Sequence, residues 1–285
     1  MMYAKWRAAP MIAATVLASV LAVTGATAAE QDYKPSVGQE GKDVIWVPTP
    51  QSLVERMLQM AGVKPTDYLI DLGSGDGRTV ITAAKKFGAT ALGIEYNPNM
   101  VELARRAAAK EGVSDKAQFQ QADIFATDFS KATVLTMYLL PSLNLKLRPT
   151  ILNMRPGTRV VSHAFTMDDW QPDQTDASDG RTAYMWIVPA KVSGTWKIDV
   201  TGAGARSYEA TFNQTFQNVA GTAKADNKTV QLSNGKLRGD SITFSLDDGT
   251  HRDFTGHVAG NKIEGTVKAG SGESKFTATR VGEAR

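Results

Sequence analysis

The sequence predicts an α/β domain, in which helices cover both faces of a parallel sheet, followed by a small antiparallel all-β domain. Two observations predict this order. From residue 46 to about residue 190, strand-like and helix-like segments alternate, which is typical of right-handed βαβ crossovers. Residues 191–285 instead contain short, Thr- and Gly-rich strands with turns between them. We therefore expect the domain boundary near Pro189 and Ala190.

The strands and helices of the first domain follow from apolar runs, cap residues and prolines. Thr49 is expected to cap a helix that begins with Pro50, and Asn97 a helix with Pro98 in its first turn. The expected strands cover residues 67–71, 89–95, 117–121, 133–139 and 159–165, and the expected helices cover 50–61, 77–86, 98–110 and 141–153.

The second domain is predicted to be a meander of roughly eight short strands, closed as an up-and-down barrel or packed as a sandwich. Three residue pairs have the composition of hairpin turns: Asn234-Gly235, Asp248-Gly249 and Gly260-Asn261. The expected strands cover residues 194–200, 210–219, 229–232, 241–246, 252–258, 262–267 and 275–279.

Residues 1–29 have the composition of a signal peptide. Lys5 and Arg7 precede an apolar run from Met11 to Val23, and the small residues at 26–28 suit a cleavage site. An uncleaved inner-membrane anchor is the alternative, because no charge interrupts residues 8–29. In either case the positive-inside rule predicts an exported, for example periplasmic, chain, with membrane association only through this segment.

Composition excludes several classes of protein. The chain of 285 residues has no cysteine, which excludes disulfides, thiolate-bound zinc and iron–sulfur clusters. Residues 30–45 are polar and are expected to form a lead-in segment. Without Lys5 and Arg7 the chain has 30 basic and 29 acidic residues, a balance that does not support nucleic-acid binding.

The strongest motif is the Gly-rich turn of residues 71–78, which directly follows the first expected strand. Such a turn lets the backbone approach a ligand at the carboxyl edge of the sheet. The dinucleotide-binding version holds a pyrophosphate, but here Asp71 precedes the glycines and Asp76 lies among them. Two carboxylates suit the cationic amino group and sulfonium of S-adenosylmethionine better than they suit a pyrophosphate. With Gly73, Ser74 and Gly75, they are the expected cofactor residues of this turn.

Acidic residues also follow the next two expected strands. Glu95, which Tyr96 follows, lies about 20 residues after the Gly-rich turn. This spacing along the sequence suits a carboxylate that contacts ribose hydroxyls. Asp123 is placed to accept from an adenine amino group, and Ile124 to pack on the base. Three acids at three successive strand ends predict a site for S-adenosylmethionine, with another nucleotide or a decayed site as the alternative.

Each of these residues also has an ordinary structural interpretation. The glycines alone would predict only a tight turn, and Asp123 alone would more often cap a helix or form a turn. Arg78 is expected to start a helix and pair with a local acid rather than to act in catalysis.

Taken together, these blocks resemble one branch of the class I methyltransferases, the lysine methyltransferases of the ATP synthase c subunit and the adenine nucleotide translocase. The resemblance spans residues 46–172 and includes residues 47–49, 71–78, 93–98, 140–143, 157–162 and 170–172. It implies a Rossmann-like sheet, binding of S-adenosyl-L-methionine by Asp71, Gly73, Gly75, Glu95 and Asp123, closure of Pro48-Thr49 over the cofactor, and a protein lysine as methyl acceptor. The C-terminal β domain is not part of that family pattern.

The acceptor end of the site is less well specified by the sequence. Residues 136–141 lack the Asn/Asp-Pro-Pro-Tyr type of motif, which argues against nucleobase and Gln or Asn acceptors. Tyr138 is expected to line the methyl-transfer site or to lie in the core. His163 is the candidate general base, with a buried, hydrogen-bonded histidine as the alternative. Asp168, Asp169 and Trp170 either rim the pocket or belong to an ordinary acidic loop.

Three functions therefore remain open from the sequence. The first is a protein-lysine methyltransferase, and the second a methyltransferase for a small envelope metabolite. The third is a non-catalytic exported protein that binds an adenosine-like ligand. The C-terminal domain is expected to hold a protein substrate, to bind a small apolar molecule, or to stabilise the enzyme.

Overall fold

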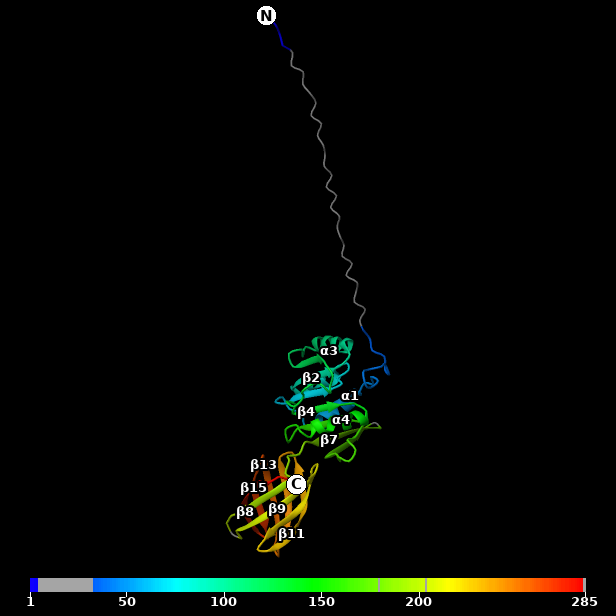
Figure 1. Cartoon of the computed structure of the whole chain (residues 1–285). Helices are drawn as coiled ribbons and strands as arrows, with labels where there is room; N and C mark the ends of the chain where they lie inside the picture. Colours follow the sequence, from blue (N-terminus) through cyan, green and yellow to red (C-terminus); the bar gives the residue numbers. More distant parts are fainter. Residues whose placement is uncertain (5–32, 179, 203, 284–285) are drawn as a thin grey trace. The chain divides into compact units, whose positions relative to one another are not determined.

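A seven-stranded mixed sheet forms the first domain, in the strand order β3-β2-β1-β4-β5-β7-β6 (Figure 1). The first five strands are parallel to one another, whereas β7 runs antiparallel to β5 and β6 antiparallel to β7. The hairpin of β6 and β7 was not predicted from the sequence. The strands are β1 (Tyr68–Leu72), β2 (Thr90–Glu95), β3 (Ala117–Gln121), β4 (Val134–Met137), β5 (Arg159–His163), β6 (Gln174–Ser178) and β7 (Arg181–Ile187).

The computed structural model describes residues 1–4, 33–178, 180–202 and 204–283. Except for the first four residues, the predicted signal peptide or anchor and the first residues of the lead-in lie outside these ranges. Within the described ranges, no helix has both the length and the apolar character needed to cross a bilayer. Residues Pro35–Arg285 form one compact unit.

The strand order reverses between β1 and β4, and this reversal positions the site. Asp71 in β1 pairs in register with Thr136 in β4, and Leu72 pairs with Met137. In open α/β sheets, ligands bind outside the carboxyl ends of the strands at such a reversal. The acids predicted at the ends of the first three strands therefore lie along one edge of the sheet.

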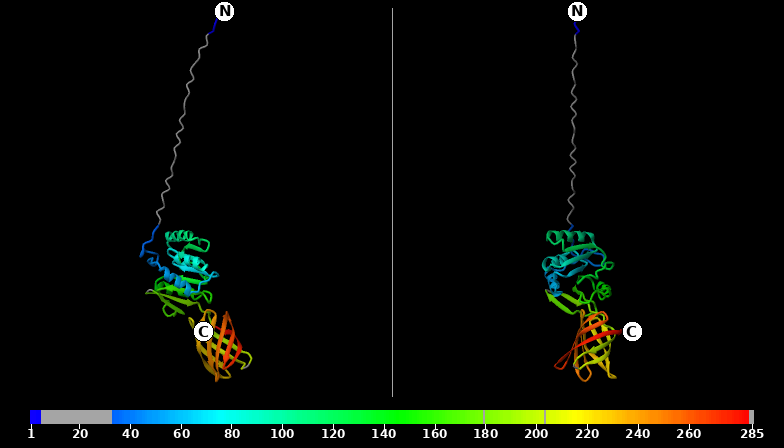
Figure 2. Two further views of the ribbon diagram at one scale, coloured as in Figure 1. Left: turned by 180° about the vertical axis from the view of Figure 1, so that it is seen from behind. Right: turned by 90° about the vertical axis from the view of Figure 1, so that its left-hand side faces the viewer.

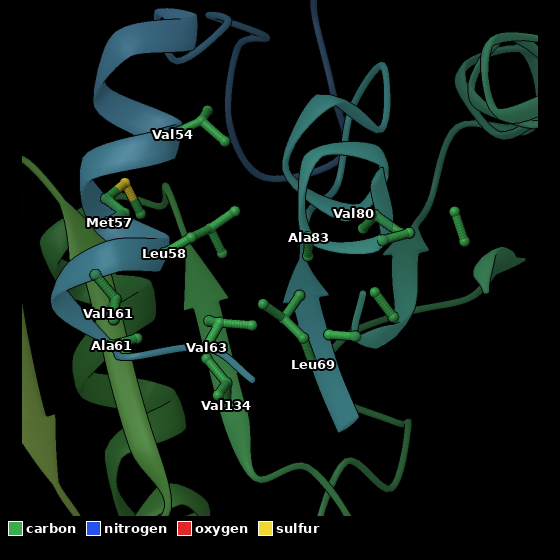
Figure 3. Close-up of a cluster of buried hydrophobic side chains, with 14 of the residues drawn as sticks. Val54, Met57, Leu58, Ala61, Val63, Leu69, Val80, Ala83, Val134 and Val161 are labelled. Carbon is green, nitrogen blue, oxygen red and sulfur yellow. The ribbon is translucent and has the colours of Figure 1, made fainter. Parts of the chain in front are cut away.

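In the described part of the chain, four helices pack on this sheet: α1 (Gln51–Met60), α2 (Arg78–Phe87), α3 (Pro98–Lys110) and α4 (Pro141–Ile151). Figure 3 shows Val54 and Leu58 extending from α1 towards the strands that carry Leu69 and Val134. All four side chains are fully buried, and each such burial contributes about 1.5–3 kcal/mol relative to exposure.

The two predicted helix caps differ in outcome. Asn97 does cap α3, because its Oδ1 accepts a hydrogen bond from the Asn99 amide at 2.9 Å. The prediction that Thr49 caps helix α1 was wrong. Helix α1 begins at Gln51 after Pro50 and has no side-chain cap, because the Thr49 hydroxyl instead meets His163 across the sheet edge.

Eight antiparallel strands close into a barrel in the second domain, so the barrel and not the sandwich is the observed form (Figure 2). In β13, side chains alternate strictly between the inside and the outside of the barrel. Aromatic rings fill the interior: Phe244 stacks on Phe254 at 4.5 Å, and Phe212 and Phe276 meet Phe244 edge-on. The strands are β8 (Gly194–Val200), β9 (Arg206–Thr215), β10 (Asn218–Ala225), β11 (Lys228–Arg238), β12 (Ser241–Asp247), β13 (His251–Ala259), β14 (Lys262–Ala269) and β15 (Gly272–Gly282).

The predicted turns of the barrel are confirmed at two of three places. Asp248-Gly249 and Gly260-Asn261 connect consecutive strands. The prediction of a turn at Asn234-Gly235 was wrong, because both residues lie within β11, at the point where its pairing with β12 shifts register. Asn234 has a φ of 54°, and a β carbon at Gly235 would lie 1.9 Å from a carbonyl oxygen of the neighbouring strand. These residues therefore form a bulge in a long strand, a feature that bends and twists the strand.

Candidate functional site

The Gly-rich turn after β1 is held tightly against the end of β2. The backbone amides of Gly73 and Ser74 both donate to the carbonyl of Ile94, at 2.9 and 3.0 Å. Gly73, Gly75 and Gly77 have φ angles of 75°, 54° and 81°, in the left-handed region that favours glycine. The turn therefore brings bare backbone to the carboxyl edge of the sheet, as the sequence predicted.

Asp71 is a buried carboxylate at the base of this turn. Its Oδ1 accepts a hydrogen bond from the Thr136 hydroxyl at 2.6 Å, and only 6% of the residue is exposed. Burial raises the pKa of Asp71 to about 7, and the negative charges of Glu95 and Asp76 add to the shift. Among the described residues, no Lys or Arg forms an ion pair with Asp71. A cationic ligand would therefore provide the missing positive charge.

The other two acids near the turn already have partners. Glu95 accepts from the amides of Gly75 and Asn97, each at 2.9 Å, so its carboxylate is fixed in place. Asp76 forms an ion pair with Arg78, whose Nη1 donates to the carbonyl of Thr49 at 2.8 Å. The expectation that Arg78 pairs with a local acid is thereby confirmed. Asp76 acts partly by holding the arginine that fastens the segment before α1.

Residues 35–49 form a strap that lies over the carboxyl edge of the sheet, where the cofactor is expected to bind. We call this edge the cofactor edge. Its hairpin is closed by the amide of Gly38 donating to the Trp46 carbonyl and the Trp46 amide donating to Gln39, both at 2.9 Å. The Trp46 indole covers the Gly turn, since a β carbon placed on Gly75 would lie 2.7 Å from Trp46 Nε1. From the sequence, only Pro48-Thr49 was expected to close over the site, and the contribution of Trp46 was missed.

Lys42 connects the strap to the third acid. Its Nζ lies 2.8 Å from Asp123 Oδ2, while Asp123 Oδ1 accepts from the Phe125 amide at 2.9 Å. The Lys42 ammonium lowers the pKa of the Asp123 carboxyl. It also lies 5.4 Å from the ring centroid of Tyr96. Both oxygens of the predicted adenine acceptor are thus engaged by the protein itself.

These elements enclose a cavity of about 720 Å³. All of the predicted cofactor residues line it: Pro48, Thr49, Asp71, Gly73, Ser74, Gly75, Asp76, Glu95, Tyr96, Asp123 and Ile124. The cavity also has an apolar part, which was not predicted from the sequence apart from Tyr138. Its apolar lining residues include Met57, Tyr138, Leu139, Leu143 and Phe165.

The two predicted catalytic residues lie together but differ in access to the cavity. Tyr138 lines it and stacks on Phe165, with ring centroids 6.1 Å apart. His163 lies behind Tyr138 at a centroid distance of 3.9 Å, is only 1% exposed and does not line the cavity. Burial, with the charge of Arg181, lowers the pKa of His163 to about 4, so its ring is neutral at pH 7. Its role as a general base remains a prediction.

The described residues fit an S-adenosylmethionine molecule. Asp71 offers a buried negative charge without a cationic partner, and Glu95 faces the same cavity. Ser74 Oγ is buried and has no hydrogen-bond partner among the described residues. Buried polar atoms are normally satisfied, so this hydroxyl is available for a polar ligand atom. The backbone of Gly73 and Gly75 also lines the cavity.

Comparison with known proteins gives the same family as the sequence motifs. Residues 71–174 match the family described as the ANTKMT methyltransferase domain. A protein-lysine N-methyltransferase of Saccharolobus islandicus (strain REY15A) is 40% identical over 151 residues, which are 51% of this chain and 94% of that protein. The lysine N-methyltransferase of the ATP synthase c subunit from Homo sapiens is 35% identical over 45% of this chain. This chain spans 54%, about half, of the human enzyme.

A solved structure supports the fold and the cofactor. The crystal structure of an RNA methyltransferase from Salinibacter ruber, in complex with S-adenosyl-L-homocysteine, is 52% identical to this chain with a TM-score of 0.50. The similarity covers 51% of this chain and 96% of that one. The Salinibacter structure and the Saccharolobus protein each match 51% of the chain, so neither accounts for its whole length.

Proposed function

Because the chain belongs to the S-adenosylmethionine-dependent methyltransferase family of the protein-lysine N-methyltransferases, we propose that it methylates the ε-amino group of a lysine in a protein substrate. S-adenosyl-L-methionine supplies an activated methyl group on a sulfonium. The chain itself supplies the binding site for the cofactor and a second, apolar compartment for the acceptor.

The apolar part of the cavity is the observation that carries this proposal. Met57, Leu139 and Leu143 provide aliphatic contacts, and Tyr138 and Phe165 provide aromatic faces. A lysine side chain has a long aliphatic stem, which buries well against such surfaces while its amine extends further. An aromatic pair also attracts a cationic amine before it loses its proton.

The amine must be neutral to attack, and the cavity favours the neutral form. Desolvation lowers the pKa of a buried lysine amine, because its charged form loses contact with water. The nitrogen lone pair then forms the new bond to the methyl carbon as the carbon–sulfur bond breaks, and the extra proton leaves the nitrogen afterwards. Tyr138 lines the cavity and is placed to contact the acceptor. The main contribution of the chain is positioning and exclusion of water.

The test is methyl transfer by the purified full chain to three kinds of acceptor. Cofactor labelled in its methyl group is incubated with lysine-containing proteins from an envelope extract, with RNA, and with the small-molecule fraction of the same extract. We expect label in protein, and mass spectrometry is expected to place it on lysine. Label confined to RNA or to small molecules would overturn the lysine assignment and leave the methyltransferase activity intact.

A matched pair of variants controls for the cofactor site. Asp71→Asn removes the buried carboxylate, whereas Asp115→Asn makes the same chemical change at an exposed position that does not line the cavity. The first variant is expected to lose labelling of every acceptor and the second to retain it.

We also propose that the chain acts outside the cytoplasm, on the basis of the charged and apolar residues of its N-terminal segment. A fusion of residues 1–40 to alkaline phosphatase, which is active only after export, tests this. Activity of the fusion supports export. Its absence, with the fusion protein present in the cytosol, contradicts it.

A further inference from the structure

Residues 164–173 form the loop between β5 and β6, and this loop contributes one wall of the acceptor compartment. Its Phe165 lines the cavity. Ala164 and Asp168 have φ angles of 65° and 59°, although neither is glycine. Left-handed backbone at such residues is unfavourable and persists only where the surroundings hold it. The contacts that hold this loop therefore decide where Phe165 lies.

Helix α4 provides one set of these contacts. Asn144 Nδ2 donates to the carbonyls of Phe165 and Thr166, at 3.3 and 3.2 Å. Arg148 Nη1 donates to the carbonyl of Met167 at 2.8 Å, and the same side chain forms an ion pair with Asp169. The expectation that Asp168, Asp169 and Trp170 rim the pocket was wrong, because none of the three lines the cavity; Asp169 instead pairs with Arg148, and Trp170 is fully buried.

The turn between β9 and β10 of the barrel provides a second set. The Phe216 ring stacks on the fully buried Trp170, with centroids 5.9 Å apart and planes 14° apart. The Arg148 guanidinium lies 5.4 Å from the same ring. Gln217, itself only 2% exposed, donates through Nε2 to the carbonyl of Gln171 at 2.8 Å. One two-residue turn of the barrel thus touches the loop and its helix support.

This turn is itself constrained. Phe216 has a φ of 53°, so it too adopts left-handed backbone without being glycine. Gln214 Nε2 donates to the Phe216 carbonyl at 2.7 Å, and the Leu237 amide donates to the Gln217 carbonyl at 2.7 Å. The turn is fixed from within the barrel and presents an aromatic ring and an amide outward, to the methyltransferase loop.

We propose that the barrel is a positioning element for methyl transfer. Through Phe216 and Gln217 it holds residues 164–173 in the conformation that places Phe165 in the acceptor compartment. This inference rests on the proposed position of the acceptor and does not depend on the acceptor being a lysine. It gives the C-terminal domain a task in the reaction, and it predicts that damage to this one turn affects the acceptor and not the cofactor.

Amide hydrogen exchange of the full chain tests the first step without any acceptor. In Phe216→Ala, we expect peptides from residues 164–173 to exchange about fivefold to tenfold faster, because an aromatic stack and a cation–π contact are lost. Peptides from β1 and β2 should exchange as in the wild type. Asn227→Ala is the matched control, because Asn227 is an exposed, left-handed residue (φ 61°) in the next hairpin turn of the barrel.

Steady-state kinetics test the second step, with whichever acceptor the labelling experiment identifies. The KM for the acceptor is expected to rise about tenfold in Phe216→Ala, while the dissociation constant of S-adenosylmethionine changes less than about twofold. Phe216→Tyr, which keeps the stack, should restore the wild-type KM. A ring that merely stabilised the fold would not separate these two constants.

Gln217→Leu provides a second variant if Phe216→Ala fails to fold. It removes the hydrogen bond to Gln171 while it keeps a side chain of similar size in the same buried place. Faster exchange confined to residues 164–173 supports the proposal. Unchanged exchange in this loop, in a folded variant of either residue, overturns it. If no acceptor of any class is labelled, the exchange result still decides whether the barrel turn holds residues 164–173, so the two proposals fail separately.

Discussion

Thr49 Oγ1 and His163 Nδ1 lie 3.0 Å apart, although 114 residues separate them in the sequence. Thr49 ends the strap that covers the cofactor edge, and His163 ends β5 behind the acceptor compartment. This hydrogen bond therefore joins the two halves of the site. It also replaces the helix cap that the sequence predicted for Thr49.

The His163→Asn variant separates the two roles of this histidine. A general base contributes about a hundredfold or more to kcat, whereas we expect a loss below about tenfold because the ring does not line the cavity. The folded-state pKa of about 4 lies below the unfolded value near 6.5, so the wild type loses stability as the pH falls from about 6.5 to 4. Urea unfolding should show a larger loss of stability over this pH range in the wild type than in the variant, because shifted carboxyl groups such as Asp67 and Asp123 contribute to the slope of both. A kcat loss above a hundredfold with normal cofactor binding would establish the base.

Cofactor affinity is predicted to depend on pH through Asp71. Its pKa is raised to about 7 in the free protein, so the carboxylate is largely protonated below that pH and cannot attract a sulfonium. The dissociation constant of S-adenosylmethionine is therefore expected to rise by about fivefold to tenfold when the pH is lowered from 8 to 6. Asp71→Asn should bind weakly at both pH values. Calorimetric titration measures this directly, and a constant affinity of the wild type across the range would contradict it.

The local parts of the site were predictable because their signals are local. The left-handed turn required glycines, and acids at strand ends follow directly from where each apolar run stops. This is why the sequence alone sufficed to assign Asp71, Glu95 and Asp123 to one edge of the sheet, and all three line the cavity. Helix α3 was equally clear, since Asn97 and Pro98 form its start within two residues.

The remaining features depend on contacts between distant residues. Lys42 and Asp123 are 81 residues apart, and nothing in the polar sequence around Lys42 indicates its partner. The β6–β7 hairpin was missed because β6 has the sequence QTDAS, without an apolar alternation. Asn234-Gly235 has the composition of a turn, yet closure of the barrel required a bulge there. In each case tertiary pairing decided the outcome over the local pattern.

Gly75→Ala is predicted to impair cofactor binding by about tenfold or more. The new β carbon would lie 2.7 Å from Trp46 Nε1, at a φ of 54° that L-residues avoid, and the Gly75 amide that fixes Glu95 would move. The double variant with Trp46→Ala should recover part of the affinity, because only the backbone strain remains.

Gly112→Ala is the control for Gly75→Ala, because Gly112 has a φ of 68° but a β carbon there would have no atom within 4 Å. It should cost about 1 kcal/mol of stability and leave binding intact, and equal binding by both glycine variants would contradict this account.

Lys42→Ala is expected to tighten cofactor binding. Lys42 occupies Asp123 Oδ2 at 2.8 Å, the acceptor predicted for the adenine amino group, so the ammonium and the base compete for one carboxylate. Exposed ion pairs of this kind are weak, so the gain should be about twofold to fivefold in the dissociation constant. Lys42→Arg keeps the charge and should bind as the wild type does, and high salt should narrow the difference between Lys42→Ala and the wild type. Calorimetric titration with S-adenosyl-L-homocysteine, which has the same adenosine without the sulfonium charge, should show the same ratio. Weaker binding by Lys42→Ala would instead mean that the strap lysine stays in place and contributes to holding the adenine.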